Sequence, residues 1–328
     1  MFRKKYDFVV IGAATRDYMF YDRAAKFLFT PADPTRQRSL CFEYGAKVSL
    51  DETYVSNGGG AANAAVNLAL QGFRTAAVVR LGDDEAGREI LKNFAAHEVD
   101  TRLVQRDEKA MTGFSFVLTA GQEQEHVIFT NRAANNRLTV SPQTLQQFKA
   151  PWIYLSSLSG PSWRKIFETV FSAPANIAWN PGSQQLLAGT AALKKYLGRT
   201  AVLALNQDEA IGLVKSSPAG QELPASRFSN VRFLLKTLQA FGPKVVVITR
   251  GKAGANAYDG RTYYYQKIVS AQRKVVDTTG VGDCFNSTFV GGLVRFSGDI
   301  QRSLGAAIAN GASLITKIGA QQGLKKVL

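Results

Sequence analysis

The chain has 328 residues, of which 45% are hydrophobic and 20% charged, so it can bury a large core as one globular unit. No run approaches the roughly 18 uninterrupted apolar residues of a membrane-spanning helix, and the apolar run that follows the basic start is too short for a secretory leader, so we expect nothing to be cleaved. The net charge of +15 could suit nucleic acid or a membrane surface, but the basic residues are dispersed in small groups without a basic stripe or stacking motif, so we expect neither partner.

Short apolar, β-branched runs alternate along the chain with segments of helical period. Runs without polar alternation are typical of strands buried on both faces, which indicates a parallel sheet covered by helices. The expected strands are Phe8–Ile11, Ala76–Val79, Trp152–Leu155, Asn176–Trp179, Ala201–Leu205 and Val245–Thr249. The expected helices cover about 61–70, 86–97, 163–171, 208–214, 231–241, 284–296 and 300–316. This pattern predicts a doubly wound α/β fold, in which ligands bind at the carboxyl ends of the strands.

Two segments interrupt this alternation. The first, about 18–56, holds the strand-like pieces Lys26–Phe29 and Lys47–Leu50, separated by a segment with two prolines. The second, about 112–130, alternates in hydrophobicity, turns near 120–122 and returns through Val127–Phe129. Both suit an antiparallel flap that packs on one face, although a surface hairpin with a variable loop would have the same sequence pattern.

Three polar or small-residue features near the N-terminal strand could contact a ligand. Asp17 follows the first strand, and a carboxylate there could accept hydrogen bonds from two vicinal hydroxyl groups. Gly59 and Gly60 would let the backbone approach a substrate, and the Asn63 amide can both donate to and accept from a hydroxyl group. A turn aspartate and tight helix packing would explain the same residues without a ligand.

Two further segments follow expected strands in the middle of the chain. Asn206 to Glu209 has the N-x-x-E pattern, which is common in helix capping and would also place one carboxylate where Mg²⁺ could use it, in part through water. Thr249 to Gly254 is a glycine-bearing turn after the last expected parallel strand.

The most informative stretch is Asp277-Thr278-Thr279-Gly280-Val281-Gly282-Asp283, which leads into a helix of small residues. The unpaired N–H groups and the roughly half positive charge of a helix N-terminus bind anions. A carboxylate at that place would be repelled by phosphate, so Asp283 is better explained as a base that acts on a hydroxyl group beside the phosphate. A glycine turn with an aspartate cap would explain the string if it stood alone.

This string resembles the D-T-x-G-x-G-D signature of the PfkB/ribokinase family of carbohydrate kinases, with Val281 where alanine is more usual. The run Gly58-Gly59-Gly60-Ala61-Ala62-Asn63-Ala64-Ala65 resembles a second signature of that family, in the expected order. The resemblance implies one ribokinase-like domain over residues 1–328, with the segments 18–56 and 112–130 as a small β lid over the sugar site. It also implies an enzyme that uses ATP with Mg²⁺.

The resemblance assigns roles residue by residue. Asp283 would be the catalytic base, with Gly280, Val281 and Gly282 holding the transferred phosphoryl group. Asp17, Gly59, Gly60 and Asn63 would bind the acceptor. Asn206, Thr249, Gly251 and Asn310 would line the nucleotide site, with Glu209 on Mg²⁺ through water. Asp277 and Thr279 match a region where some relatives bind K⁺, but the C-terminal loop has glycine where a hydroxyl residue is expected, so activation by K⁺ stays open.

The expected reaction is transfer of the γ-phosphoryl group of ATP to a hydroxyl group of a sugar or sugar derivative. A nucleoside kinase of the same family is the alternative, with Phe27, Phe29, Phe114 or Phe116 stacking on the base. A relative without activity should have lost the base or a phosphate-site glycine, and neither is lost.

Free ribose is not expected to be the best acceptor. Thr15, Gly60 and Ser159 stand where a ribokinase-like site has an asparagine, a lysine and a glutamate.

The remaining expectations concern the location of the protein in the cell, metal or hydrolase chemistry, and the oligomeric state. Cys41 and Cys284 do not form a disulfide framework, which favours the cytoplasm. The two histidines have no partners at metal spacing, so neither a zinc site nor a Ser-His hydrolase is expected. The protein should be a monomer or a homodimer.

Overall fold

A large sheet forms the centre of the protein in the computed structural model, which describes residues 6–22, 26–29, 38–120, 125–147, 149–268 and 275–328. Its strand order is β16-β15-β14-β13-β12-β11-β1-β6. The strands from β6 to β14 run parallel, and β15 and β16 add an antiparallel edge. Their bounds are β1 Phe8–Ile11, β6 Thr75–Val78, β11 Trp152–Leu155, β12 Asn176–Trp179, β13 Thr200–Asn206, β14 Val245–Thr249, β15 Ala255–Tyr258 and β16 Tyr263–Gln266.

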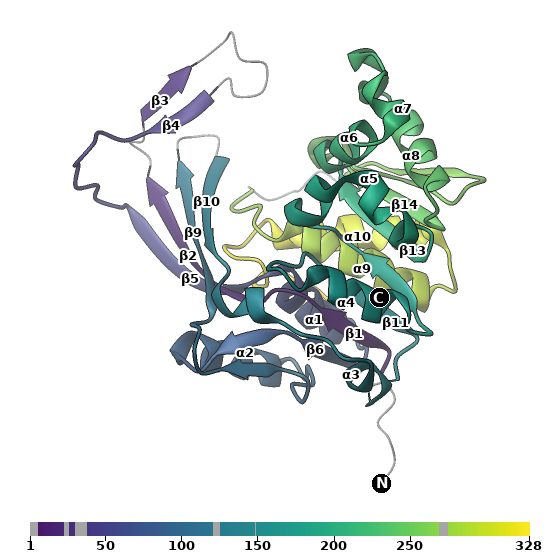
Figure 1. The fold of residues 1–328 in the computed structure, drawn as a ribbon. Helices are drawn as coiled ribbons and strands as arrows, with labels where there is room; N and C mark the ends of the chain where they lie inside the picture. Colours follow the sequence, from purple (N-terminus) through teal and green to yellow (C-terminus); the bar gives the residue numbers. More distant parts are fainter. Residues whose placement is uncertain (1–5, 23–25, 30–37, 121–124, 148, 269–274) are drawn as a thin grey trace.

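Helices cover both faces of this sheet (Figure 1). Residues of α1 Gly60–Leu70, α2 Glu85–Ala96, α9 Val281–Arg295 and α10 Ile300–Leu314 pack in one buried cluster. Residues of α4 Trp163–Phe171, α5 Ser183–Leu197, α6 Gln207–Lys215 and α8 Val231–Ala240 pack in the other. The strand β1 contributes Phe8 and Val10 to the first cluster and Val9 and Ile11 to the second, as expected of a strand buried on both faces. The expected doubly wound fold is confirmed.

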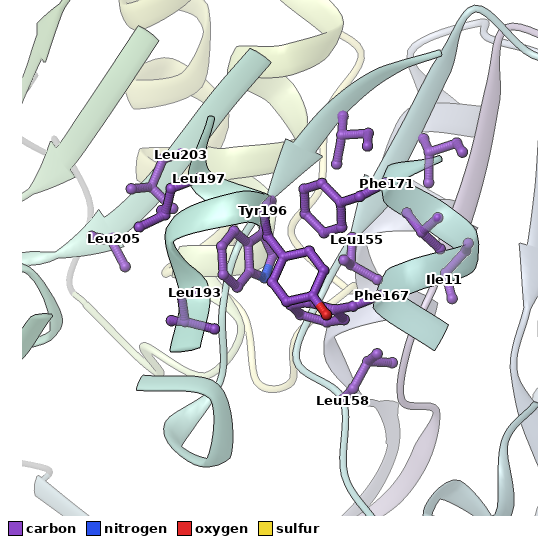
Figure 2. Close-up of a cluster of buried hydrophobic side chains, with 14 of the residues drawn as sticks. Ile11, Leu155, Leu158, Phe167, Phe171, Leu193, Tyr196, Leu197, Leu203 and Leu205 are labelled. Atoms are coloured by element: carbon purple, nitrogen blue, oxygen red, sulfur yellow. The ribbon is translucent and has the colours of Figure 1, made fainter. Parts of the chain in front are cut away.

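The second cluster contains a group of aromatic side chains from α4, α5 and β12, drawn in Figure 2. The ring of Phe167 contacts those of Phe171, Trp179 and Tyr196, with centroid distances between 5.0 and 5.3 Å. Around these rings lie aliphatic side chains of the sheet and of α5, among them Leu155, Leu193, Leu197, Leu203 and Leu205. This packing fixes the strands whose carboxyl ends carry the candidate site.

A smaller sheet of four strands projects beyond the carboxyl ends of the large sheet (Figure 1). Its order is β10-β9-β2-β5, with bounds β2 Thr15–Asp22, β5 Glu52–Gly58, β9 Gly113–Ala120 and β10 Glu125–Asn131. The strands β3 Lys26–Phe29 and β4 Arg38–Cys41 pair as a separate hairpin, and β7 Arg80–Gly82 pairs with β8 Gln105–Asp107. The four strands come from the two segments that were expected to form the flap.

Register in the small sheet divides its side chains between two faces. Asp17 lies directly opposite Ser56 and Ser115, so these three share a face. Phe114 lies opposite Arg16, and Phe116 opposite Tyr18, so both phenylalanines belong to the other face. Tyr18 and Phe114 pack against Phe116 there, with centroid distances of 5.6 and 5.2 Å. Phe114 and Phe116 therefore do not share a face with Asp17, and their stacking on a nucleoside base stays a prediction.

Some details of the chain differ from the expectation. Lys47–Leu50 is not a strand. Lys26–Phe29 is the strand β3, but it pairs with β4. The strand of this segment that pairs with β2 is β5, because such pairing is decided by the partner strand. Asp17 lies inside β2 and not in a turn. The expected turn near 120–122 lies largely outside the described residues.

No local pattern indicated β4, β7, β8, β15, β16, α5 or the short elements η1 Ala133–Arg137, α3 Pro142–Gln147, α7 Pro218–Gln221, η2 Ala225–Ser229 and η3 Gly251–Ala253. Both cysteines are free. Among the described residues, no helix is long and apolar enough to cross a membrane.

Candidate active site

The start of α9 provides backbone donors at the carboxyl edge of the large sheet. Gly280 caps the helix in the left-handed conformation, with φ of 73°, which favours glycine. The Val281 N–H donates to the Thr278 carbonyl, whereas the N–H groups of Gly282 and Asp283 have no hydrogen-bond partner among the described residues. A Cβ on Gly282 would meet nothing within 4 Å. The helix therefore presents free donors to open space, which is the arrangement that binds an anion.

The three consecutive glycines Gly58, Gly59 and Gly60, at the start of α1, bring the two signature motifs together. A Cβ on Gly58 would lie 1.8 Å from Oδ2 of Asp17, and one on Gly60 would lie 3.3 Å from Oδ1 of Asp283. Gly59 has φ of 90°, and a Cβ there would lie 2.7 Å from the Ala13 carbonyl oxygen. Position 59 therefore requires glycine, and Gly58 and Gly60 let the side chains of Asp17 and Asp283 approach this segment closely.

Asp283 lies in the first turn of α9 and is half-buried. Its Oδ2 accepts a hydrogen bond of 2.8 Å from Nδ2 of Asn63 in α1. Burial raises the pKa of the Asp283 carboxyl, the charge of Asp17 raises it further, and the hydrogen bond from Asn63 lowers it, with a net shift upward. A carboxylate with a raised pKa and one free oxygen is suited to accept a proton.

Asp17 is buried, with 6% of its surface exposed, on the face of the small sheet that it shares with Ser115. Burial raises the pKa of its carboxyl, while hydrogen bonds from the hydroxyl groups of Thr15 and Ser115 lower it. The Thr15 hydroxyl donates to Oδ1 at 2.9 Å. Thr15, at a position where the resemblance expects an asparagine, is thus engaged by Asp17 itself.

Asn206 and Glu209 cap α6 through two mutual hydrogen bonds. The Asn206 side chain accepts from the Glu209 N–H at 2.8 Å, and Oε2 of Glu209 accepts from the Asn206 N–H at 2.9 Å. Burial raises the pKa of Glu209, and the charges of Asp283 and Asp208 raise it further. The carboxyl of Glu209 therefore lies within electrostatic range of the base, in a place where added negative charge is unfavourable.

Glu209 and Asp283 fit a Mg²⁺ ion that keeps part of its hydration shell. The described residues contain no group of three or more acidic, histidine or cysteine side chains that could hold a metal on their own. Mg²⁺ usually takes one or two carboxylates from the protein and completes its shell with water and substrate phosphates. The pair formed by Glu209 and Asp283 supplies the negative charge that such an ion would neutralise.

The turn after β14 lies beside the start of α6. Thr249 ends β14, and its hydroxyl donates to the Leu205 carbonyl at 3.5 Å. The Arg250 side chain donates to Oε1 of Gln207 at 2.9 Å. Gly251 has φ of 51°, and a Cβ there would meet nothing within 4 Å. This turn is thus open to a ligand and close to Asn206.

Asp277 ties the signature motif to the C-terminal segment. Its Oδ1 accepts from the Thr279 N–H at 2.9 Å, and its Oδ2 accepts from the Gly319 N–H at 2.7 Å. The Thr279 hydroxyl oxygen is buried and has no partner among the described residues. An oxygen of this kind fits a cation that prefers oxygen ligands.

Asn310 occupies a different environment from the expected one. It is fully buried, its amide donates to Asn67 and Thr288 at 2.9 Å, and its oxygen accepts from the Lys325 N–H at 2.9 Å. These bonds join α10 to α1, α9 and the C-terminal segment. We therefore leave Asn310 out of the nucleotide site, since it has no exposed polar atom to offer an adenine.

The structure adds residues that no sequence motif indicated. Gln321 donates to Oδ1 of Asn63 at 2.9 Å, and Asn93 donates to Oε1 of Gln321 at 2.8 Å. The hydroxyl groups of Tyr154 and Ser156 are buried without a partner among the described residues. The charge of Asp283 adds to the raised pKa of Tyr154, and a Cβ on Gly60 would lie 3.2 Å from the Ser156 hydroxyl oxygen. No local pattern marks these four residues, because only the tertiary fold brings each of them to the site.

Comparisons with known proteins agree with this geometry. The profile of the pfkB family carbohydrate kinases matches residues 31–327. The chain is 27% identical to Fructokinase-1 of Zea mays over 80% of its own length and 83% of that protein, and 27% identical to aminoimidazole riboside kinase of Salmonella typhimurium over 81% and 84%. The structure of ribokinase from Arabidopsis thaliana, complexed with ribose and ATP, superposes with a TM-score of 0.76 at 20% identity, covering 98% of this chain and 96% of that one. The chain belongs to the pfkB family of carbohydrate kinases and is a phosphotransferase with a hydroxyl acceptor.

Proposed function

We propose that the protein transfers the γ-phosphoryl group of ATP to a hydroxyl group of a sugar or sugar derivative, with Asp283 as the general base. The observation that carries the proposal is the position of Asp283, whose carboxylate stands beside free N–H groups at the start of α9 and within electrostatic range of Asp17. The anion-binding donors would hold the phosphate, and the two carboxylates would bind and activate the hydroxyl acceptor.

In this mechanism Oδ1 of Asp283 accepts the hydroxyl proton as the acceptor oxygen attacks the γ-phosphorus, while the bond from that phosphorus to the β,γ-bridging oxygen breaks and ADP leaves. Oδ2 stays hydrogen-bonded to Asn63. Because burial and Asp17 raise its pKa, the carboxylate binds the proton more readily than an exposed aspartate would. A general base of this kind contributes on the order of 10² to 10⁴ in rate.

The N–H groups of Gly282 and Asp283 would hold the charge that develops on the transferred group, with Gly280 and Val281 shaping the turn that aims them. Mg²⁺ would neutralise the phosphate oxygens when bound. Glu209 would hold it through water, with Asn206 fixing the orientation of Glu209. Thr249 and Gly251 would line the nucleotide site at the open turn after β14.

Asp17 would accept hydrogen bonds from vicinal hydroxyl groups of the acceptor, and the backbone at Gly59 and Gly60 would contact it. The small sheet would act as the lid, since its Asp17 face carries the acceptor carboxylate and adjoins the base. Closure of such a lid excludes water, which would otherwise compete as the acceptor. The whole chain would then be one catalytic domain with its lid.

A sugar is favoured over a nucleoside by the register of the small sheet, which turns Phe114 and Phe116 away from Asp17. Nucleosides remain among the acceptors to be tested, because one relative of 27% identity is named as a riboside kinase.

K⁺ would bind, if it activates the enzyme, at the unpartnered hydroxyl oxygen of Thr279 beside Asp277. Comparing the rate in K⁺, Na⁺ and choline chloride at equal ionic strength decides this point.

The deciding experiment measures ADP release with Mg²⁺ and ATP across free hexoses, pentoses, sugar acids, sugar phosphates and nucleosides. We expect one sugar class to raise ADP release well above the rate without acceptor, and removal of Mg²⁺ to abolish it. Preference for adenosine, inosine or guanosine would establish the nucleoside alternative. The absence of acceptor-dependent ADP release across all classes would contradict the proposal.

A further inference from the structure

We infer that Gln321 and Asn93, which lie outside the signature motifs, are positioning residues for the base, because they hold Asp283 in one orientation through Asn63. The inference rests on the proposed function, since it concerns how the same site keeps its base in place. Asn63, which the family resemblance assigns to acceptor binding, then has the orientation of Asp283 as its first role.

Three amide side chains donate in one direction toward the carboxylate. Nδ2 of Asn93 in α2 donates to Oε1 of Gln321 at 2.8 Å. Nε2 of Gln321 in the C-terminal segment donates to Oδ1 of Asn63 at 2.9 Å. Nδ2 of Asn63 in α1 donates to Oδ2 of Asp283 at 2.8 Å. Side chains from three separate parts of the chain thus end on one oxygen of the base.

The direction of this relay is set by the carboxylate. An ionised carboxylate only accepts hydrogen bonds, so Asn63 must turn its NH₂ group toward Asp283 and its oxygen toward Gln321. Gln321 must then turn its NH₂ group toward Asn63 and its oxygen toward Asn93. Reversing the middle amide alone would place two oxygens together on one side and two NH₂ groups together on the other. The relay therefore has one favourable arrangement while Asp283 is ionised.

The spacing between α1 and α9 is held by a buried stripe on α1. Asn63 and Asn67 in α1 and Gln71, which caps its C-terminal end, recur every fourth residue and so lie on one side of the helix. Nδ2 of Asn67 donates to the hydroxyl groups of Ser287 and Thr288 in α9, both at 2.8 Å. Oε1 of Gln71 accepts from the Val327 N–H at 2.8 Å. These bonds keep α1 against α9 and the C-terminal segment, at the separation that the relay needs.

The relay gives the two carboxylate oxygens of Asp283 different roles. Oδ2 is occupied by Asn63, which is itself buried with 4% of its surface exposed. Oδ1 lies above Gly60, where a Cβ would come within 3.3 Å of it. With its orientation fixed, Asp283 needs no reorientation at the moment of proton transfer. The loss of a relay member should therefore lower kcat and leave the binding of both substrates nearly unchanged.

The test uses Gln321→Met, which keeps the length of the side chain and removes its hydrogen-bonding groups. Losing the donor to Asn63 should lower kcat by about two- to tenfold, the range that corresponds to one net hydrogen bond. The KM values for ATP and acceptor should change by less than about twofold, because Gln321, unlike Asn63, has no assigned contact with either substrate. The acid limb of the kcat profile should move upward by about half a pH unit, since a less well-held Asn63 lowers the pKa of Asp283 less. The matched control is Gln322→Met at the neighbouring exposed residue, which should leave all three quantities unchanged.

Gln321→Glu separates a relay from simple packing. The glutamate has the same size but cannot donate to Asn63, so it should draw the Asn63 amide away from Asp283 and lower kcat at least as much as the methionine does. A packing role would instead leave the isosteric glutamate close to wild type. Asn93→Leu, at a half-buried residue of α2, should give a smaller change in the same direction, and it carries the test if the position 321 variants do not fold.

Wild-type kcat and an unmoved acid limb in folded Gln321→Met and Gln321→Glu would overturn the inference, as would a raised KM for the acceptor at unchanged kcat. Asp283→Asn keeps the two hypotheses apart. If Asp283→Asn is inactive and the Gln321 variants are normal, the relay is wrong and the base stands. If Asp283→Asn keeps its activity, the proposed base is wrong.

Discussion

Replacing the base by its amide, Asp283→Asn, should abolish turnover without loosening the fold. The asparagine has nearly the same shape, and its oxygen can still accept the 2.8 Å hydrogen bond from Asn63. It cannot take a proton from a hydroxyl group near neutral pH. Since general bases contribute on the order of 10² to 10⁴ in rate, the activation barrier should rise by about 3 to 5 kcal/mol and kcat should fall at least about a hundredfold.

The stability of the same variant should change in the opposite direction. Burial and the Asp17 charge raise the pKa of Asp283 in the folded state above its unfolded value. A group of this kind contributes stability below the unfolded pKa, near 3.9 for an aspartate, and loses that contribution as pH rises through the folded pKa. At pH 7 the wild type therefore holds an unfavourable buried charge that Asp283→Asn lacks. The thermal midpoint of the variant at pH 7 should equal or exceed that of the wild type, and the difference should shrink as the pH is lowered into the titration range of Asp283.

The assay measures the rate of ADP release with the best acceptor as a function of pH. The thermal midpoints of the wild type and the variant are measured at the same pH values. For the wild type, kcat should fall as the pH drops through the raised pKa of Asp283, because only the ionised form accepts the proton. A variant that keeps more than about a tenth of wild-type turnover would refute Asp283 as the base. A lower midpoint for the variant at pH 7 would refute the argument from burial.

Two further substitutions and one substrate comparison test the phosphate and acceptor sites. Gly282→Val should abolish the stabilisation by ATP and Mg²⁺, which is about 2.7 kcal/mol at 100 times the dissociation constant. The reason is that its side chain would enter the open space before the helix N–H groups. The matched control Gly212→Val, at another exposed helical glycine with no atom within 4 Å of its Cβ, should keep that stabilisation, and equal ATP shifts in both variants would place the nucleotide elsewhere. Asp17→Asn should raise the KM for the acceptor and leave the ATP shift intact, and an unchanged acceptor KM would remove Asp17 from the site. Free ribose should not give the highest kcat/KM, because Thr15 is already bonded to Asp17 and Gly60 has no side chain to offer a polyol. The acceptor panel tests this, and ribose as the best substrate would contradict it.

The sequence alone determined most of the parallel part of the central sheet and the approximate place of the helix that carries the base. The strands β1, β11, β12 and β14 begin and end where the apolar runs predicted, because a strand buried on both faces must be apolar at every position. That helix was expected from about residue 284, after a turn over residues 280–283, whereas α9 begins at Val281, because Gly280 caps it in the left-handed conformation that favours glycine. The family also followed from local patterns, and the comparisons confirm it. The roles of individual site residues, a single domain and the cytoplasmic location stay predictions.

Only the tertiary structure decided which side chains meet. The pairing of β2 with β9 and β5 set the face of Asp17 and turned Phe114 and Phe116 away from it, since a strand's register depends on partners far along the chain. The same holds for Asn63, whose amide contacts Asp283 and Gln321 at sequence separations of 220 and 258 residues. Hydrogen-bond direction in such a cluster depends on every member at once, so no local pattern of residues could predict it.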